Sequence, residues 1–239
     1  MLDNAALPVD AALFDCDGVL VDSEWITNSV LRAMLHELGW AVSEADCFRL
    51  FVGRALHDEL GVITANTGFV VTEDWIAEFR QRRNEALLSD LQEIPGAVAA
   101  AREVDRIFGG SLACASGADR FKVELQLTKV GLADVFAGKI FSGMEMPRSK
   151  PAPDVYLAAA AALGVDPART AVVEDTATGV HAGVAAGAVV LGYCPPGSPA
   201  HHAPEVLLAA GASYTFTSMT DLPGLLTRLP ARPHVAGAR

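Results

Sequence analysis

Residues 11–24 read Ala-Ala-Leu-Phe-Asp-Cys-Asp-Gly-Val-Leu-Val-Asp-Ser-Glu, and this stretch decides the fold of the chain. An apolar run at 11–14 ends in two carboxylates, Asp15 and Asp17, just before a glycine. Side chains of a strand alternate between its two faces, so both carboxylates leave the sheet edge on the same side. Such a pair is a solvated strand end, a metal site, or a nucleophile beside an acid/base group. The rest of the chain decides among these.

The composition indicates a folded, acidic protein. Of the 239 residues, 51% are hydrophobic and 20% are charged, and the net charge is -11. This charge argues against a nucleic acid or an anionic membrane as partner, and an anionic substrate would need a metal ion or placed cations. Residues 1–10 lack the basic and apolar regions of a signal peptide, and no apolar run of about 18 residues predicts a membrane span. We therefore expect a cytoplasmic protein.

Short apolar runs alternate with helical patterns along most of the chain. The predicted strands lie at 11–16, 111–116, 139–142, 170–174, 188–193 and 213–216. The predicted helices between and after the later strands lie at 96–105, 118–130, 153–163, 177–186, 203–210 and 221–228. This alternation predicts an α/β fold, with a three-layer, Rossmann-like parallel sheet covered by helices on both faces.

One region interrupts the alternation. Between the first strand and Pro95-Gly96 the pattern is helical and amphipathic, and we find no convincing buried strand there. A connection of this length is not an ordinary loop. We therefore predict a helical cap at 22–91, inserted into a core made of 1–21 and 92–239, with hinges near 21–24 and 89–95.

Polar segments follow four of the predicted strands or the loops after them. They read Asp-Cys-Asp-Gly at 15–18, Ala-Ser-Gly-Ala-Asp at 115–119, Ser-Lys-Pro-Ala-Pro-Asp at 149–154 and Glu-Asp-Thr-Ala-Thr-Gly at 174–179. In a doubly wound sheet the carboxyl ends of the strands form the ligand crevice, so all four segments are expected to meet at one place.

The expected cluster holds more carboxylates than can ionise together. Asp15, Asp17, Glu174 and Asp175 would share a small volume, and like charges this close require a cation. Mg²⁺ fits, because it binds through one or two carboxylates together with water and a phosphate oxygen of a substrate. The four cysteines have no paired short spacing, which argues against a zinc site.

The same cluster suggests how a phosphoryl group would be bound and transferred. Lys150 and Ser116 add a cation and a hydroxyl, and with backbone amides near Asp17 and Gly117 they would hold the non-bridging phosphate oxygens. Asp15 is placed to attack phosphorus and form an aspartyl-phosphate. Asp17 would protonate the leaving oxygen and then deprotonate the attacking water.

Together the four segments resemble the four motifs of the haloacid dehalogenase-like superfamily, and the helical insert resembles its helical-cap subfamily. That subfamily includes enzymes like phosphoglycolate phosphatase, β-phosphoglucomutase and sugar-phosphate phosphatases. The resemblance covers about residues 10–228 and implies a monomer. It implies Mg²⁺ on Asp15, on Asp175 and on the carbonyl of Asp17, with Glu174 as a further ligand or as a group behind the ligands.

Substrate choice is expected to lie in the cap, because the core sees only the phosphate. Arg54 lies in a loop that points into the active site of the resembling proteins, and Arg82, Arg83 and Asn84 lie on the last cap helix. One of these arginines would reach a carboxylate or hydroxyl of the substrate, although an exposed helix face explains them equally well. The six histidines receive no role.

Each core segment also has a simpler interpretation. Ser116 would cap the helix at 118–130, Glu174 or Asp175 would cap the helix that follows them, and Asp22 or Ser23 would cap the first cap helix. The capping role of Ser116 is compatible with the chemistry above. For Glu174 and Asp175 the metal-binding role is favoured over capping, and Asp22 and Ser23 are left outside the chemistry.

The prediction is a phosphoric monoester hydrolase that acts on a small phosphorylated metabolite, a sugar or sugar-acid phosphate. A β-phosphoglucomutase-like mutase is the first alternative, but the resembling mutases carry a histidine where this chain has Thr27 and a lysine where it has Arg83. Dehalogenases lack the second aspartate, and phosphonate cleavage needs a cap lysine, which 22–92 does not contain. A non-catalytic sensor of phosphorylated metabolites is the remaining alternative, and the intact catalytic set argues against it.

Overall fold

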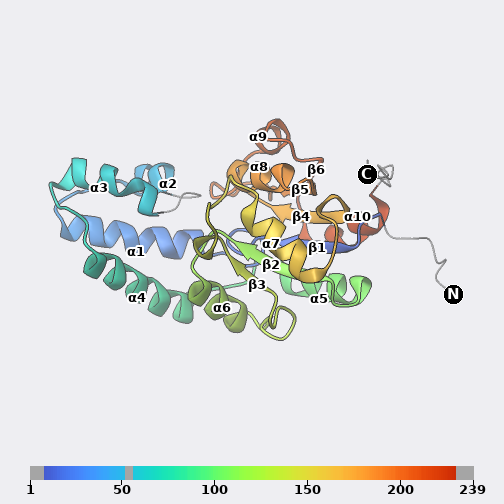
Figure 1. Ribbon diagram of the computed structural model, residues 1–239. Helices are drawn as coiled ribbons and strands as arrows, with labels where there is room; N and C mark the ends of the chain where they lie inside the picture. Colours follow the sequence, from blue (N-terminus) through green and yellow to red (C-terminus); the bar gives the residue numbers. More distant parts are fainter. Residues whose placement is uncertain (1–7, 52–55, 230–239) are drawn as a thin grey trace.

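The computed structural model describes residues 8–51 and 56–229 of the chain. In these ranges a parallel sheet is flanked by helices, and a group of further helices lies beside it (Figure 1). The strands are β1 (Ala11–Phe14), β2 (Leu112–Ser116), β3 (Ile140–Ser142), β4 (Thr170–Glu174), β5 (Val189–Tyr193) and β6 (Tyr214–Phe216). The helices are α1 (Glu24–Glu37), α2 (Glu44–Phe51), α3 (Leu60–Thr67), α4 (Glu73–Asp90), α5 (Ala97–Phe108), α6 (Arg120–Lys129), α7 (Asp154–Leu163), α8 (Ala177–Ala185), α9 (Pro204–Ala209) and α10 (Leu222–Arg228).

The order of the strands places the catalytic candidates at the centre of the sheet. The order is β3-β2-β1-β4-β5-β6, and every neighbouring pair is parallel. Strand β1 lies between β2 and β4, with Phe14 in register with Cys114 on one side and Val173 on the other. This is the doubly wound order in which the ligand crevice lies at the carboxyl ends of the strands where the order reverses, here between β1 and β4.

Two apolar layers hold the sheet between its helices. One layer packs α5, α6 and α10 against the face that carries Phe14 and Leu112, and the other packs α7, α8 and α9 against the face that carries Leu13 and Val172. The central strands are buried on both faces, as the unbroken apolar runs in their sequences require.

Helices α1 to α4 form a separate cluster with an apolar core of its own. Leu35, Ile63 and Phe79 are among the buried residues that build this core. Figure 1 shows these helices, in blue to teal, beside the end of the sheet. Two chain segments connect them to the core, and these segments pair with one another, because Asp22 N donates to Gln92 O at 3.1 Å.

The predicted α/β fold, a three-layer parallel sheet covered by helices on both faces, is confirmed. Small differences occur at the ends of elements. Strand β1 ends at Phe14 rather than at residue 16, because the chain turns at Gly18, whose φ of +74° is a left-handed conformation. The predicted domain boundaries at 21/22 and 91/92 stay a prediction. No helix in the described part of the chain is long and apolar enough to cross a membrane.

Candidate active site

A cavity of about 740 Å³ lies between the carboxyl ends of the strands and helices α1, α2 and α4. It is lined by the side chains that follow β1, β2 and β4 and by the loop before α7. Among the predicted residues, those that line it are Asp15, Asp17, Arg83, Ser116, Gly117, Lys150 and Glu174. Segments that are far apart in sequence therefore meet at one cavity, as the strand order requires.

Lys150 lies between two carboxylates at the base of the cavity. Its Nζ donates to Asp15 Oδ1 at 2.9 Å and to Glu174 Oε1 at 2.7 Å. Burial alone would lower the pKa of Lys150, but the charges of Asp15 and Glu174 outweigh it, and the pKa lies well above its ordinary value. Lys150 is therefore held as a buried cation between the two carboxylates.

Glu174 is fully buried, and hydrogen bonds occupy both of its oxygens. Oε1 also accepts from Tyr156 Oη at 2.7 Å, while Oε2 accepts from the backbone N–H groups of Asp175 and Thr176 and from the Thr176 hydroxyl. A Cβ on Gly179 would lie 1.7 Å from Oε1, which explains the glycine that ends this segment. Burial would raise the pKa of Glu174, but the charge of Lys150 and these donors keep it below its ordinary value.

Asp175 differs from Glu174, its neighbour, because hydrogen bonds do not occupy both of its oxygens, and its Oδ2 lies 4.0 Å from His201 Nε2. It is buried, and its Oδ1 has no hydrogen-bond partner among the described residues. Its other oxygen packs on Gly18, where a Cβ would lie 2.1 Å from Oδ2. Burial, together with the charges of Glu174 and Asp15, raises the pKa of Asp175 well above its ordinary value.

These groups fit a hard divalent cation. Oxygen atoms of Asp15, Asp175 and Glu174 lie within 4.8 Å of one another, and all three residues are buried. Burial raises the pKa of Asp15 to about 7, since Lys150 offsets it only in part and the charges of Glu174 and Asp17 add to it. A bound cation would stabilise the ionised forms of Asp15 and Asp175 and satisfy the unpartnered oxygen.

Asp17 is held by three donors that meet on one oxygen. Ser23 Oγ, Lys122 Nζ at 2.7 Å and Gln126 Nε2 at 2.8 Å all donate to Oδ1. Burial would raise the pKa of Asp17, but the charge and hydrogen bond of Lys122, with the two neutral donors, outweigh it and lower the pKa to about 2. Asp17 is thus an ionised carboxylate in this state.

The helix-capping roles considered above for the core segments are not seen in the structure. Helix α6 is capped by Asp119 and α8 by Thr176, so neither Ser116 nor the two acids after β4 cap a helix with their side chains. Ser116 Oγ accepts from Ala118 N at 3.1 Å, inside the loop that leads to α6. Ser23 stands at the start of α1, but its hydroxyl binds Asp17 instead of the helix backbone.

The predicted cap residues divide into two groups. Arg83 is buried, lines the cavity and donates to Asp119 Oδ2 at 3.0 Å and to Asn84 Oδ1 at 2.9 Å, whereas Asn84 is not among the lining residues. Arg82 points to the surface, where it pairs with Glu37 and Glu78. Arg54 lies outside the described residues.

The sequence analysis did not predict several residues that lie at the site. Lys122 and Gln126 contact Asp17, and Tyr156 contacts Glu174; Lys122 is conspicuous only as one of four lysines in the chain. His201, to which no role was given, donates from Nε2 to the carbonyl of Gly18 at 2.7 Å. It thereby braces the turn that carries Asp17.

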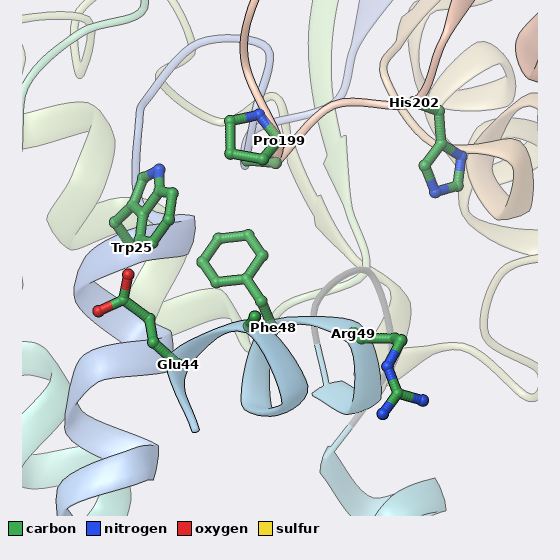
Figure 2. Close-up of a pocket in the computed structure, with 8 residues that line it drawn as sticks. Trp25, Glu44, Phe48, Arg49, Pro199 and His202 are labelled. Carbon is green, nitrogen blue, oxygen red and sulfur yellow. The ribbon is translucent and has the colours of Figure 1, made fainter. Parts of the chain in front are cut away.

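A second, smaller cavity of about 400 Å³ lies between α1, α2 and the loop before α9. Figure 2 shows Trp25 and Phe48 near one another and facing Pro199, with His202 on the same loop. The Trp25 and Phe48 ring centroids are 4.3 Å apart. No predicted site residue from the described ranges lines this cavity, which sets it apart from the site above.

A buried lysine, a carboxylate pair after the first strand and a further acid after the fourth define the class of phosphoryl-handling enzymes built on a doubly wound sheet. The sequence model of the haloacid dehalogenase-like hydrolase family matches residues 9–187. The chain belongs to this family.

Known relatives agree in length and in class. The chain is 30% identical to 6-phosphogluconate phosphatase of Escherichia coli K12 over 221 residues, 91% of this chain and 94% of that protein. It is 30% identical to hexitol phosphatase B of the same strain over 225 residues, covering 89% and 93%. The prediction that this chain is an enzyme, a phosphoric monoester hydrolase, is confirmed.

A solved structure gives the same architecture. A haloacid dehalogenase family hydrolase from Deinococcus radiodurans R1, crystallised with bound phosphate and sodium, superposes with a TM-score of 0.74 at 34% identity. The match covers 93% of this chain and 99% of that one. This chain therefore shares its three-layer fold with that hydrolase.

Proposed function

We propose that this protein is a Mg²⁺-dependent phosphatase that hydrolyses a small phosphorylated sugar or sugar acid through an aspartyl-phosphate on Asp15. The observation that carries the proposal is the pair Asp15 and Lys150, 2.9 Å apart in the lining of the large cavity, with a carboxylate oxygen of the buried Asp175 within 4.8 Å of one of Asp15. The pair supplies a nucleophile, a cation for the phosphoryl oxygens and a place for the metal.

The metal would be held by Asp15, by Asp175 and by the backbone carbonyl of Asp17. When bound, Mg²⁺ supplies positive charge that offsets the negative charge of the phosphoryl group. We assign Glu174 to the group behind the ligands, because five hydrogen bonds already occupy its two oxygens. Its role is to hold Lys150 in place beside Asp15.

In the first step, a carboxylate oxygen of Asp15 forms a bond to phosphorus while the bond from phosphorus to the leaving oxygen breaks. Asp17 gives a proton to that oxygen. Since the pKa of Asp17 is about 2 in the present state, its carboxyl group must gain this proton once the substrate is bound. Lys150, Ser116 and the backbone amide of Gly117 bind the non-bridging oxygens.

In the second step, water attacks phosphorus and the bond to Asp15 breaks, which releases inorganic phosphate. Asp17 takes the proton from the attacking water. This step requires Asp17 as an ionised base, and that is the form in which Lys122 and its two neutral neighbours hold it.

The proposed substrate class is supported by the residues of α1 and α4 that line the cavity. Arg80 and Arg83 line it, and Arg80 has no ion pair among the described residues. Thr27 also lines it, with a buried hydroxyl that lacks a hydrogen-bond partner in the same ranges. Two cations and an open hydroxyl suit a polyhydroxylated substrate that carries a carboxylate, and the name of the 6-phosphogluconate phosphatase relative supports this choice.

The cap residues also bear on the mutase alternative. Thr27 and Arg83 face the cavity where the resembling mutases carry a histidine and a lysine, so a group that would help return the phosphoryl group to the sugar is absent at both positions. Hydrolysis remains the proposal.

The test is a screen of the purified protein with Mg²⁺ against 6-phosphogluconate, hexitol phosphates, glucose 6-phosphate and phosphoglycolate, with released phosphate as the readout. A coupled assay follows the conversion of β-glucose 1-phosphate to glucose 6-phosphate. Release concentrated on sugar acids or polyols supports the proposal. Glucose 6-phosphate formed without free phosphate would identify a mutase, and no turnover on any substrate would favour a sensor.

A further inference from the structure

The three hydrogen bonds to Asp17 are distributed unevenly over its carboxylate. All three donors meet Oδ1, and within residues 8–51 and 56–229 no hydrogen bond to Oδ2 is found. Asp17 lines the large cavity. A carboxylate fixed by three donors on one oxygen cannot rotate about its last bond without losing them, so its other oxygen stays available to the cavity.

The donors come from two different parts of the chain. Ser23 belongs to the segment that leads into α1, while Lys122 and Gln126 are one turn apart on α6. Both α6 side chains are buried, Lys122 at 7% and Gln126 at 0% exposure. Gln126 is oriented in turn by Cys16, whose thiol donates to its Oε1 at 3.4 Å.

The start of α6 is itself fixed from both sides. Asp119 Oδ1 accepts from the backbone N–H of Lys122 at 2.9 Å and caps the helix. Asp119 Oδ2 forms an ion pair with Arg83 on α4. The position of Lys122 is therefore tied to the helix that lines the far side of the cavity.

We propose that Lys122 is a positioning residue for the acid/base Asp17: with Gln126 and Ser23 it holds Oδ1 and so directs Oδ2 at the leaving oxygen and, later, at the attacking water. This inference rests on the proposed function, since it assumes that Asp17 transfers those protons. Lys122 carries the largest share because it is the only charged donor of these three, so it adds the attraction of an ion pair to its hydrogen bond with the ionised Asp17.

The test compares Lys122→Met, Lys122→Arg and a matched control, Lys129→Met. Lys129 ends the same helix, but it is exposed, and within the described part of the chain its one hydrogen bond from Nζ goes to Ser89 O at 3.3 Å. Initial rates are measured on 6-phosphogluconate, whose alkoxide leaving group needs a proton, and on p-nitrophenyl phosphate, whose phenolate leaves without one. Thermal unfolding confirms that each variant is folded, and crystal structures of the wild type and of Lys122→Met report the rotamer of Asp17.

With Lys122→Met we expect kcat on 6-phosphogluconate to fall by about 100-fold with little change in KM, because misplacing a reacting group by about 1 Å costs a factor of that size. The first-turnover burst of p-nitrophenolate should stay near that of the wild type while later turnovers slow, because only hydrolysis of the phosphoenzyme still needs Asp17. Lys122→Arg should recover much of the loss, and the Asp17 carboxylate should rotate in the methionine variant.

Three results would overturn the inference. The first is a folded Lys122→Met protein whose kcat equals that of Lys129→Met. The second is a loss of kcat/KM in Lys122→Met that is equal on both substrates and comes from a higher KM. The third is an Asp17 carboxylate that keeps its wild-type rotamer in the crystal structure of Lys122→Met. A wild-type protein with no phosphatase activity on any substrate would instead refute the proposed function, and the positioning role would fall with it. Activity in the wild type and the control therefore separates the two failures.

Discussion

Replacing Glu174 by Gln tests the inference that this buried carboxylate is a fully bonded support and not a metal ligand. Its five donors are Lys150, Tyr156, two backbone N–H groups and a threonine hydroxyl. A glutamine keeps one acceptor oxygen, so in either orientation its amide NH₂ faces at least two donors. Lys150 also loses one of its two counter-charges.

The magnitude follows from these contacts. Breaking a buried pair by removing one partner costs about 3–5 kcal/mol, and each hydrogen bond to a charged group contributes about 1.5–3 kcal/mol. We expect Glu174→Gln to lower the free energy of unfolding by about 3–5 kcal/mol, measured by urea titration in EDTA with circular dichroism and tryptophan fluorescence. Glu103→Gln is the control, since the side chain of Glu103 is 42% exposed and, among the described residues, pairs only with Arg106, and it should leave stability nearly unchanged.

Calorimetric titration with Mg²⁺ completes this test. If Glu174 lies behind the ligands, Glu174→Gln should keep most of the Mg²⁺ affinity, while Asp175→Asn should lose it. A variant as stable as the wild type would refute the account of the five bonds. A loss of Mg²⁺ binding equal to that of Asp175→Asn, in a protein that remains folded, would make Glu174 a ligand.

Three further results are expected. Gly18→Ala should weaken Mg²⁺ binding in calorimetry, because its Cβ would lie 2.1 Å from a carboxylate oxygen of the metal site; Gly39→Ala, at a similar positive φ but with open space around it, should not. Arg83→Met should lower kcat/KM for 6-phosphogluconate more than for p-nitrophenyl phosphate. Arg82→Met, at a side chain that pairs with Glu37 and Glu78 instead of lining the cavity, should change neither. Burial lowers the pKa of His202, so as the pH falls this histidine is protonated in the unfolded state before it is protonated in the folded one. The free energy of unfolding should therefore fall as the pH drops below about 6.5. Urea titrations should show a smaller fall for His202→Gln.

The fold was predictable because the strands of the core are short apolar runs that end in polar segments. Four of those segments carry residues that share the crevice once the strands are parallel and in this order, so the positions of Asp15, Ser116 and Lys150 followed from the pattern. The ends of the elements were less predictable. The turn at Gly18 shortens β1 through a backbone conformation that an apolar run does not reveal.

Side-chain partners were beyond the reach of the sequence. The ion pair between Lys122 and Asp17 joins residues 105 positions apart, and its helix carries no motif that singles it out. Arg82 and Arg83 are adjacent, and only the packing of α4 decides that one faces solvent while the other lines the cavity. Glu174 and its neighbour Asp175 likewise look alike in sequence, yet one is fully bonded and the other has an unpartnered oxygen.

The most direct test of the central claim is to trap the covalent intermediate. The wild type is mixed with Mg²⁺ and the best substrate of the screen, quenched in acid and treated with borohydride, which reduces an aspartyl-phosphate to homoserine. Peptide mass spectrometry then locates the change. We predict homoserine at position 15, dependent on both substrate and Mg²⁺ and absent from Asp15→Asn. Steady turnover with Asp15 unchanged, or a label on another residue, would contradict the account.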